Sequence, residues 1–505
     1  MELLLTVISS LLTFENFLFL NLGVFCGIII GALPGLTATL GVALLMPLTF
    51  GMEAIPGIIL LIGVYCGGIY GGSITAILIK TPGTPASACT AIEGYVLAQR
   101  GEAGKALDLA LKASTFGGLF SAVVLLFVAP QVSAFALTFS YVEYFALAVF
   151  GLSLIASVSG DNQIKGLIAG MLGLLIACVG MDPIDGTSRF VFVRDLLAGI
   201  DIIPIMIGVF AITEIIQKSK SVFKKTDEMF EFSNKGVSNR EFFSLWPTLL
   251  RSSFIGTFVG AVPGTGAAIA SFLSYSEAKR SSKHKELFEH GSLEGLSASE
   301  AANNGVTGAT LIPLLTLGIP GDTVTAIMLG ALMMQGLTPG PLLFTTHPDT
   351  LYTLMLAVFF ANIFMFLQGK FMIRVFANVT KIPTAVLIPL LLNLCMIGSY
   401  AGNNSVFDVR LSVIFGLFGV IMMWLEIPLT PMVIAVVLGE LAEANMRRGL
   451  SMSSGDVSIF FTRPVSLFFI AIAVCSLLFP TIRKLMDYSR AKRKANVTET
   501  SDDKN

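Results

Sequence analysis

Residues 31–35 read Gly-Ala-Leu-Pro-Gly, and residues 260–264 repeat the pattern as Gly-Ala-Val-Pro-Gly. A second pair follows in the same order, because Thr81-Pro82-Gly83-Thr84 is echoed by Ile319-Pro320-Gly321-Asp322. All four motifs lie in apolar stretches, and the two pairs are displaced by 229 and 238 residues, a difference that a loop can absorb. The order and spacing of the pairs indicate an internal duplication.

A Pro-Gly pair inside an apolar helix removes backbone hydrogen bonds and costs about 3 kcal/mol or more. At membrane depth, broken backbone is tolerated only where protein or a water-filled cavity covers it. Four such interruptions therefore predict re-entrant or discontinuous helices around one central site. The helix N-termini there offer partial positive charge to an anion, and the freed carbonyl groups can hold a cation.

The composition around these motifs is that of a polytopic membrane protein. Of the 505 residues, 54% are hydrophobic and 13% are charged, with 32 Lys and Arg against 33 Asp and Glu. A soluble globular chain has about 25% charged residues. The composition excludes a soluble cytosolic enzyme, a nucleic-acid-binding protein with a basic face and a disordered scaffold.

The apolar runs predict an all-α fold with about 11 to 13 membrane segments, since a spanning helix needs about 20 apolar residues. Two long charged breaks interrupt these apolar segments, and a basic stretch follows the last one. We expect the breaks and the basic stretch to lie in the cytoplasm. We predict a first transmembrane repeat at 1–217, a basic cytoplasmic linker at 218–250, a second transmembrane repeat at 251–482 and a cytoplasmic tail at 483–505.

The placement of charge indicates that the repeats are inverted. The loop at 51–54 lacks Lys and Arg and is expected outside, whereas its counterpart at 276–299 is basic and is expected inside. Opposite sides at matched positions mark an inverted repeat. One observation does not fit. A perfect inversion would put the C-terminal ends of the two halves on opposite sides of the membrane, whereas 218–225 and 483–494 are both basic and both expected in the cytoplasm. An extra crossing in one half would reconcile the two.

Hydroxyl groups and glycines gather around the interruptions, and we expect them to bind the substrate. The candidates are Pro34, Gly35, Thr37, Ser73, Lys80, Thr81, Pro82, Gly83, Thr84, Pro263, Gly264, Thr265, Gly266, Pro320, Gly321 and Thr323. The alternative is that these small residues only let the helices pack closely. Lys80 either pairs with a substrate carboxylate or extends to the membrane surface.

Ionisable residues inside apolar stretches are functional candidates. Asp322 either coordinates Na⁺ or carries a proton, or it caps the helix that begins there. Glu300, Asn303 and Asn304 share one side of a predicted helix, where they either bind the coupling cation or stabilise an amphipathic segment locally. If the coupling ion is Na⁺ rather than H⁺, we expect it near Asp322.

The sequence contains no motif for a catalytic site or a resident cofactor. HExxH, the phosphate-binding GxxxxGK[ST] and the nucleophile elbow are all absent from it, and the six cysteines form no CxxC pair. We therefore expect a transporter driven by an ion gradient rather than an enzyme.

These motifs resemble those of the large membrane subunit of the tripartite tricarboxylate transporters, the TctA type. The matching blocks run in family order from about residue 17 to 345. They are Gly31-Ala-Leu-Pro-Gly35-Leu-Thr37, Tyr70-Gly-Gly-Ser-Ile74, Thr81-Pro-Gly-Thr-Pro-Ala-Ser87, Gly291-Ser-Leu-Glu-Gly295, Ser299-Glu-Ala-Ala-Asn-Asn304, Leu317-Gly-Ile-Pro-Gly-Asp-Thr323 and Gln335-Gly-Leu-Thr-Pro-Gly340.

The resemblance implies a multi-pass permease of the bacterial inner membrane that imports small organic anions of the di- or tricarboxylate class by alternating access. A Na⁺ or H⁺ gradient would drive it. The implied partners are a periplasmic solute-binding protein and a small four-helix-type membrane subunit. This chain departs from the family at Lys80, where a neutral polar residue, often Asn, is usual; the departure leaves the transported anion open.

Two other functions remain open from the sequence. One is a stand-alone secondary transporter or channel that needs no periplasmic binding protein. The other is an intramembrane enzyme acting on lipid-linked substrates, which would need a catalytic cluster of Asp, His or Cys at a membrane face; no such cluster is visible in the sequence.

Overall fold

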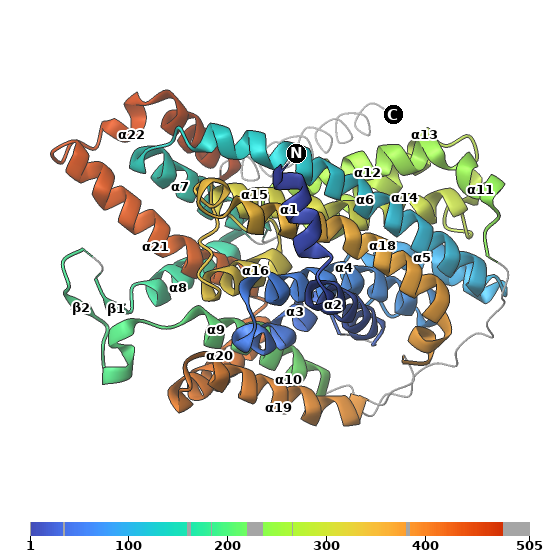
Figure 1. The fold of residues 1–505 in the computed structure, drawn as a ribbon, viewed down its shortest axis with the longest axis horizontal. Coiled ribbons are helices and arrows are strands. Elements are labelled where there is room, and N and C mark those ends of the chain that lie inside the picture. The colour runs from blue at the N-terminus through green and yellow to red at the C-terminus, as the bar shows by residue number, and fades with distance from the viewer. Residues whose placement is uncertain are drawn as a thin grey trace, which may run out of the picture. The chain divides into compact units, whose positions relative to one another are not determined.

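The described part of the chain is helical. The computed structural model describes residues 2–33, 36–158, 163–182, 184–219, 236–264, 266–379 and 384–477. Among these residues, one antiparallel ribbon of two short strands, β1 (Gly180–Met181) and β2 (Ser188–Arg189), is the exception. The prediction of an all-α fold is confirmed (Figure 1).

The chain forms two compact units. Unit 1 comprises Met1–Thr138 and Ile200–Leu425, and unit 2 comprises Phe139–Gly199 and Glu426–Asn505. Each predicted repeat, here called the first half (1–217) and the second half (251–482), contributes residues to both units. A repeat is defined by matched sequence and a unit by packing, so the predicted domain boundaries stay a prediction.

Several of the described helices are long and apolar enough to cross a membrane. These seven are Phe14–Ala32, Ala54–Ile79, Ala103–Ala136, Ile202–Ser219, Pro348–Phe376, Val406–Trp424 and Leu429–Met452. The shorter apolar helices are Ala38–Gly51, Tyr141–Ser153, Gln163–Ala177, Thr323–Met334, Leu387–Asn403 and Pro464–Leu477. Helices of fewer than about 17 residues reach only part of the way across the hydrocarbon core. The predicted total of 11 to 13 segments therefore stays a prediction.

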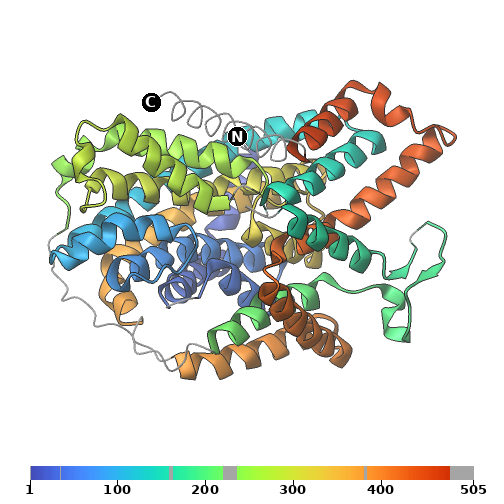
Figure 2. The same ribbon diagram turned by 180° about the vertical axis from the view of Figure 1, so that it is seen from behind.

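Helix α4 (Ala54–Ile79) forms the centre of unit 1. Every residue from Pro56 to Ile79 is buried. Helices of both halves surround it: α2 (Phe14–Ala32), α3 (Ala38–Leu45), α5 (Ser87–Gln99), α6 (Ala103–Ala136), α14 (Leu293–Ala309), α16 (Thr323–Met334) and α18 (Pro348–Val379). Figure 2 shows the same helices from behind.

Helices α2 and α4 run parallel and touch through their backbones. Gly23, Gly27 and Gly31 are spaced four residues apart on the face of α2 toward α4. A Cβ atom at Gly27 would lie 2.5 Å from the carbonyl oxygen of Val64, and one at Gly31 would lie 2.3 Å from that of Gly68. Small residues at this spacing let two membrane helices approach closely.

The same arrangement occurs in the second half, between α12 (Trp246–Ala261) and α14. A Cβ atom at Gly256 would lie 2.4 Å from the carbonyl oxygen of Ala302, and one at Gly260 would lie 2.9 Å from the Cβ of Ala309. The two glycines stand at the positions of Gly27 and Gly31, displaced by the 229 residues of the first motif pair.

Packing between the halves follows the same correspondence. Helix α6 packs against α12 and α14, and α18 packs against α2 and α4. Likewise α5 packs against α13 (Gly266–Ser281), and α16 packs against α3. Each of these contacts between the halves thus has a counterpart with the halves exchanged.

Two further groups of three helices share this pattern. In unit 2, α7 (Tyr141–Val158) and α8 (Gln163–Ala177) pack against α21 (Leu429–Met452). In unit 1, α19 (Thr384–Asn403) and α20 (Val406–Trp424) pack against one continuous helical segment. That segment consists of α9 (Ile202–Met206), the π-helical turn η3 (Ile207–Ile212) and α10 (Thr213–Ser219). Each group combines two consecutive helices of one half with a helical segment of the other half, α21 in unit 2 and residues 202–219 in unit 1.

The described end of the linker is fastened to the first turns of α6. The backbone N–H of Val237 donates to Asp108 Oδ2 at 2.9 Å, and Lys112 Nζ donates to the carbonyl oxygen of Val237 at 3.1 Å. Lys105 Nζ contacts Glu241 Oε1 at 2.7 Å, and this hydrogen bond holds the pKa of Glu241 at about 2. The linker thus rejoins unit 1 beside a group of basic residues.

The remaining elements are short. They are α1 (Glu2–Leu11), η1 (Met46–Gly51), η2 (Arg194–Ala198), α11 (Asn239–Ser244), η4 (Lys285–Leu287), α15 (Leu311–Leu317), α17 (Leu343–Thr346) and α22 (Ile459–Thr462).

Candidate substrate and cation site

The Thr-Pro-Gly element and its counterpart begin with the same helix ending. Helix α4 ends at Lys80 and α15 ends at Gly318, and both residues adopt the left-handed conformation, with φ of 53° and 71°. The N–H of Thr81 reaches back to the carbonyl oxygen of Thr75 at 3.3 Å, and that of Ile319 to Pro313 at 3.2 Å. A left-handed residue with this long hydrogen bond is a common way to end a helix.

Both elements then start the next helix with reciprocal side-chain caps. In the first half, the N–H of Thr84 donates to Ser87 Oγ at 3.1 Å, and the N–H of Ser87 donates to Thr84 Oγ1 at 3.2 Å. In the second half, the N–H of Asp322 donates to Thr325 Oγ1, and the N–H of Thr325 donates to Asp322 Oδ1, each at 2.8 Å. Residues 75–87 and 313–325 therefore match one for one at the displacement of 238 residues.

The interruptions within each half lie against each other. The N–H of Gly264 donates to the carbonyl oxygen of Gly321 at 2.8 Å, which joins Pro263-Gly264 to Pro320-Gly321. In the first half, a Cβ atom at Gly83 would lie 2.5 Å from the carbonyl oxygen of Gly31. The close contact between these backbones requires glycine at position 83.

The predicted residues at the first interruption of each half are only partly described. Pro34, Gly35 and Thr265 lie outside the described residues. Thr37 caps α3, because its Oγ1 accepts from the N–H of Leu40 at 3.1 Å. Gly266 begins α13 with a positive φ of 70°.

One polar contact joins α3 of the first half to α16 of the second. Thr39 Oγ1 lies 3.2 Å from Thr323 Oγ1, so the first turns of these two helices meet. Beside them, the Tyr65 hydroxyl of α4 donates to Asp322 Oδ2 at 2.8 Å and lies 3.0 Å from Thr310 Oγ1. Thr325 Oγ1 also lies 2.7 Å from Asp322 Oδ1. Asp322 therefore both caps α16 and contacts the other half.

Glu300 on α14 is fully buried and receives three hydroxyl groups. Ser73 Oγ donates to Oε1 and Ser114 Oγ donates to Oε2, each at 2.7 Å, and Thr90 Oγ1 also donates to Oε1. The donors come from α4, α6 and α5, which all belong to the first half. Hydroxyl donors offset the large cost of removing a carboxylate from water.

The two asparagines beside Glu300 are fully buried, and most of their polar atoms have no hydrogen-bond partner. Asn303 lacks a partner at both Nδ2 and Oδ1, and Asn304 lacks one at Oδ1. The Nδ2 of Asn304 donates to the carbonyl oxygen of Glu300 at 3.2 Å. A buried polar atom without a partner costs about 1–3 kcal/mol. These amide atoms could therefore bind a polar species such as water or a cation.

Lys80 and Thr81 lie apart from the two carboxylates. The side chain of Lys80 is exposed, and its Nζ lies 5.4 Å from the centre of the Tyr95 ring. Thr81 and Pro82 are also exposed, and Thr81 Oγ1 donates to the carbonyl oxygen of Ile79 at 3.2 Å. A substrate-binding role for these residues stays a prediction.

The structure adds partners that the sequence did not single out. Thr37 Oγ1 donates to Glu214 Oε2 at 3.1 Å, which places a carboxylate of α10 at the first interruption. Tyr65, Thr90 and Ser114 complete the surroundings of Asp322 and Glu300. Of these residues, only Glu214 could have been recognised from the sequence, because it is an acidic residue in an otherwise apolar helix.

Another buried carboxylate, that of Glu93 on α5, has a mainly structural arrangement. It accepts hydrogen bonds from the N–H groups of Gly291 and Ser292 at 2.8 and 2.7 Å, and from the Tyr275 hydroxyl at 2.6 Å. These bonds fasten α5 to the start of α14, the helix that carries Glu300.

The chain is similar to known proteins over most of its length. The model of the tripartite tricarboxylate transporter TctA family matches residues 17–434. An uncharacterized 52.8 kDa protein in the TAR-I ttuC' 3' region of Agrobacterium vitis is 35% identical over 483 residues, which cover 95% of this chain and 96% of that protein. An uncharacterized protein in the TAR-II ttuC' 3' region of the same organism is 34% identical over 235 residues, covering 46% of this chain and 97% of that protein. No solved structure matches.

Proposed function

Because the chain belongs to the tripartite tricarboxylate transporter TctA family, we propose that it is the permease subunit that imports a small organic anion, driven by a cation gradient. The family and the apolar helices make it a multi-pass membrane component of a transporter. The observation that carries the proposal is the contact between Thr39 and Thr323, which brings the starts of α3 and α16 together from opposite halves.

We propose that the halves are inverted repeats with interrupted helices. Three observations support a duplication: the matched conformation of 75–87 and 313–325, the glycine contacts of α2 and α12, and the exchanged packing of α6 and α18. Their inversion is supported by the placement of Lys and Arg at matched loops.

The anion would bind where the interrupted helices begin. Backbone N–H groups at a helix start are unpaired and carry partial positive charge, which attracts carboxylate groups. The starts of α3 and α16 meet at Thr39 and Thr323, with Thr37 in the same segment. A di- or tricarboxylate could there receive backbone N–H groups and hydroxyls from both halves. We also retain the other residues that the sequence predicts to bind the substrate in this proposal.

Asp322, Glu300, Asn303 and Asn304 would serve the coupling ion, Na⁺ or H⁺. Asp322 stands next to the proposed anion site and contacts Tyr65, which also contacts Thr310 at the end of α14. Glu300 lies on α14, ten residues before Thr310. At 1.5 Å per residue this separation is about 15 Å. We therefore divide the predicted cation group into two positions, one at Asp322 and one at Glu300 with the two asparagines.

The remaining parts of the proposal follow the family resemblance. A periplasmic solute-binding protein would deliver the anion, and a small four-helix-type membrane subunit would assemble with this chain in the bacterial inner membrane. Movement of one part of the repeat pair against the rest would alternate access, with the C-terminus in the cytoplasm.

Uptake of labelled succinate, malate and citrate into proteoliposomes tests the proposal. The full chain is reconstituted with its small subunit and binding protein, under a Na⁺ gradient, an H⁺ gradient or neither. We expect uptake of one of these acids to require one gradient and the binding protein. Asp322→Asn should abolish accumulation, because the isosteric amide keeps the helix cap but removes the charge.

Four outcomes would contradict the proposal. Accumulation without any gradient would indicate another energy source, and equilibration alone would indicate a channel. Uptake of unchanged rate without the binding protein would favour a stand-alone transporter. Normal accumulation by Asp322→Asn would remove the Asp322 charge from ion coupling.

A further inference from the structure

The carboxylate of Glu214 on α10 lies beside the proposed anion site. Its Oε2 accepts a hydrogen bond from Thr37 Oγ1 at 3.1 Å, and Thr37 caps the start of α3, where the anion would bind. The side chains of Glu214 and Thr37 are partly exposed, as are those of Thr39 and Thr323, where α3 meets α16. Molecules the size of water can therefore contact all four side chains.

The packing of α10 against α20 fixes the position of Glu214. Thr213 Oγ1, which directly follows the π-helical turn η3, donates to the carbonyl oxygen of Gly416 at 3.0 Å. A Cβ atom at Gly419 would clash with the same hydroxyl group, so the two helices are in close contact. π-Helical turns occur frequently at functional sites. Here the turn precedes the residue that points toward Thr37.

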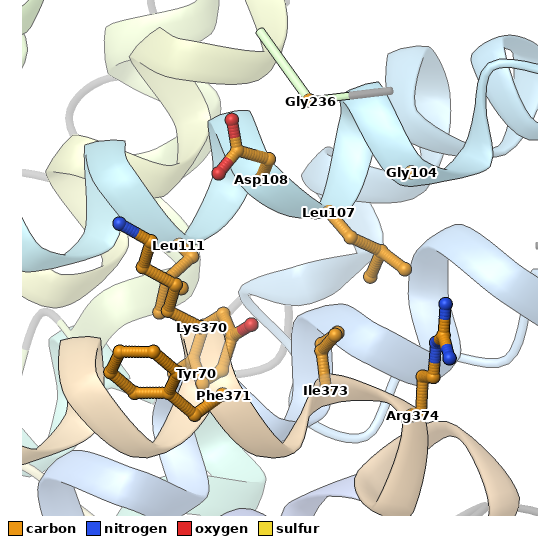
Figure 3. A pocket seen from close by; sticks show the side chains of 11 residues that line it. Tyr70, Gly104, Leu107, Asp108, Leu111, Gly236, Lys370, Phe371, Ile373 and Arg374 are labelled. Atoms are coloured by element: carbon orange, nitrogen blue, oxygen red, sulfur yellow. The ribbon is translucent and has the colours of Figure 1, made fainter. Parts of the chain in front are cut away.

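Glu214 has fewer hydrogen-bond donors than the other carboxylates that lie inside unit 1. Glu300 and Glu93 each receive at least three donors. Asp108, which lines a pocket of about 430 Å³ at the start of α6 (Figure 3), receives an ammonium group and a backbone N–H. Among the described residues, the Thr37 hydroxyl is the hydrogen-bond donor to Glu214. The ionised form of Glu214 thus receives the least compensation of these four carboxylates for its removal from water.

Few charged groups face Glu214. Helix α10 packs against η3, α19 and α20, and η3 also packs against α3. Of these elements, η3, α19 and α3 contain no Asp, Glu, Lys, Arg or His. The ionisable residues of α19 and α20 are Cys395, Tyr400, Asp408 and Arg410. Cysteine and tyrosine are uncharged near pH 7.

The charges of α20 lie far from Glu214, whereas one cation of α10 lies close to it. The Asn403 amide donates to both Asp408 and Asp201, each at 2.9 Å, which places the start of α20 beside the start of α9. Asp201 precedes Glu214 by thirteen residues, roughly 20 Å along a helix. Lys218, one turn after Glu214, acts on it electrostatically. The charge state of Glu214 therefore depends mainly on Lys218, on Thr37 and on any anion bound beside them.

The single proton of the Thr37 hydroxyl couples Glu214 to the anion site. An ionised carboxylate only accepts hydrogen bonds. While Glu214 is ionised, Thr37 donates to it and accepts from the N–H of Leu40, so Thr37 has no proton left for an anion. A protonated Glu214 can instead donate to Thr37 Oγ1, and the Thr37 proton can then turn toward an anion. Protonation also removes the repulsion between Glu214 and the anion.

We propose that Glu214 binds a proton together with the transported anion. The proton arrives from water and binds the Glu214 carboxylate, and the Thr37 hydroxyl turns from Glu214 to a carboxylate of the anion at the start of α3. Because such coupling is reciprocal, the bound anion favours the protonated form of Glu214 as much as the proton favours binding of the anion. Glu214 is thus a positioning residue that acts through Thr37, and H⁺ is a coupling ion. This inference rests on the proposed function, because it takes the anion site at Thr37 as given.

Proton uptake on binding tests the inference. The full chain is placed in phosphatidylcholine nanodiscs at pH 7 and constant NaCl, and succinate, malate and citrate are titrated calorimetrically in buffers of different ionisation enthalpy. The buffer dependence gives the protons taken up per bound acid. We expect the unsubstituted protein to take up more protons than Glu214→Gln, by up to about one per acid, because protons bound by the acid or by Asp322 contribute to both.

The affinity of the same variant gives a second readout. Glu214→Gln mimics the protonated side chain, since its amide can donate to Thr37 and carries no charge. At pH 8 it should therefore bind the acid about tenfold more tightly than the unsubstituted protein.

Control variants separate this role from total charge and from packing. Glu53→Gln removes an exposed carboxylate of unit 1 and should leave the proton count unchanged. Thr37→Val removes the hydroxyl and should lower the count although Glu214 is present, whereas Thr37→Ser should restore it. A purely structural role of Glu214 would not change the count, because protons are counted per bound acid.

The outcomes distinguish this inference from the proposed function. Acid binding with equal proton counts in the unsubstituted protein and Glu214→Gln would overturn the inference and leave the proposed function standing. Binding without proton uptake by the unsubstituted protein would do the same, and it requires no variant. A changed count in Glu53→Gln would assign the coupling to total charge, and an unchanged count in Thr37→Val would exclude Thr37 as the link; either result overturns the inference. If none of the acids binds, the proposed substrate class fails together with it.

Discussion

Lys80 ends α4 in a conformation that suits glycine better than lysine. A non-glycine residue in the left-handed region costs about 1–2 kcal/mol, whereas the contact of the exposed Lys80 ammonium group with the Tyr95 ring is worth about 0.5–1 kcal/mol. The strain is the larger of the two. We therefore expect Lys80→Gly to raise the free energy of unfolding by about 1 kcal/mol, measured as an increase in the thermal unfolding midpoint in detergent.

Two further variants check the reason for that increase. Lys80→Gln removes the charge but keeps the strain, and it should be no more stable than the unsubstituted protein. Gly318→Ala places a Cβ atom at the matched position, 3.0 Å from the carbonyl oxygen of Pro339, and should lower the midpoint. A Lys80→Gly midpoint below that of the unsubstituted protein would mean that the interactions of the ammonium group outweigh the strain.

The sequence revealed the carboxylates of the site but not their partners. Glu300, Asn303 and Asn304 were recognisable because polar residues are rare in apolar helices. Their setting was not, since the hydroxyls of Ser73 and Ser114 come from residues 227 and 186 positions away in the chain. Such pairs depend on how α4 and α6 pack against α14, and a local pattern does not contain that information.

At the scale of helices, the backbone contact between α2 and α4 makes a direct prediction. Gly27→Ala would force a methyl group to within 2.5 Å of the carbonyl oxygen of Val64. To relieve this clash, the backbones of α2 and α4 would have to move apart, which weakens their packing. Overpacking typically costs about 1–3 kcal/mol, so the variant should have a lower thermal unfolding midpoint and poorer insertion. Gly51→Ala is the matched control, because nothing lies within 4 Å of its added Cβ. Equal midpoints for the two variants would contradict close packing at Gly27.

The π-helical turn η3 is an element that a search for helical periodicity does not find. Nine residues separate Pro204 from Glu214, whereas eight separate Pro431 from Glu440 in α21 of the second half. A π turn accommodates one extra residue in a helix. The proposed duplication thus explains η3 as a one-residue insertion, which sets the direction of Glu214 toward Thr37. From sequence alone, a single inserted residue cannot be distinguished from a shift in alignment.

At the scale of the whole molecule, the compact units do not coincide with the halves. Unit 2 takes α7 and α8 from the first half and α21 from the second, while α19 and α20 pack in unit 1 against α9, η3 and α10. The first half therefore cannot complete its own packing, nor can the second. Read along the chain, the repeat motifs predicted two halves, but the exchange of α21 and of the segment 202–219 between the halves depends on contacts that no local motif encodes. This exchange makes each half a packing partner of the other, and the proposed alternating access would move two such related parts against each other.

The inversion of the halves makes the last prediction, because it places matched loops on opposite sides of the membrane. Single cysteines are introduced at the exposed positions Glu53 and Ser281, which follow the first interruption of each half, and at Gln99 and Thr338, which follow the second. In intact cells, a membrane-impermeant maleimide should label Glu53→Cys and Thr338→Cys at the periplasmic face. Ser281→Cys and Gln99→Cys should react only after the membrane is permeabilised, since basic residues hold their loops in the cytoplasm. The unsubstituted chain, with its exposed Cys475, supplies the background signal. Labelling of both members of either pair from the same side would mean that the halves are parallel, and the matched segments 75–87 and 313–325 would then face the same way in the membrane.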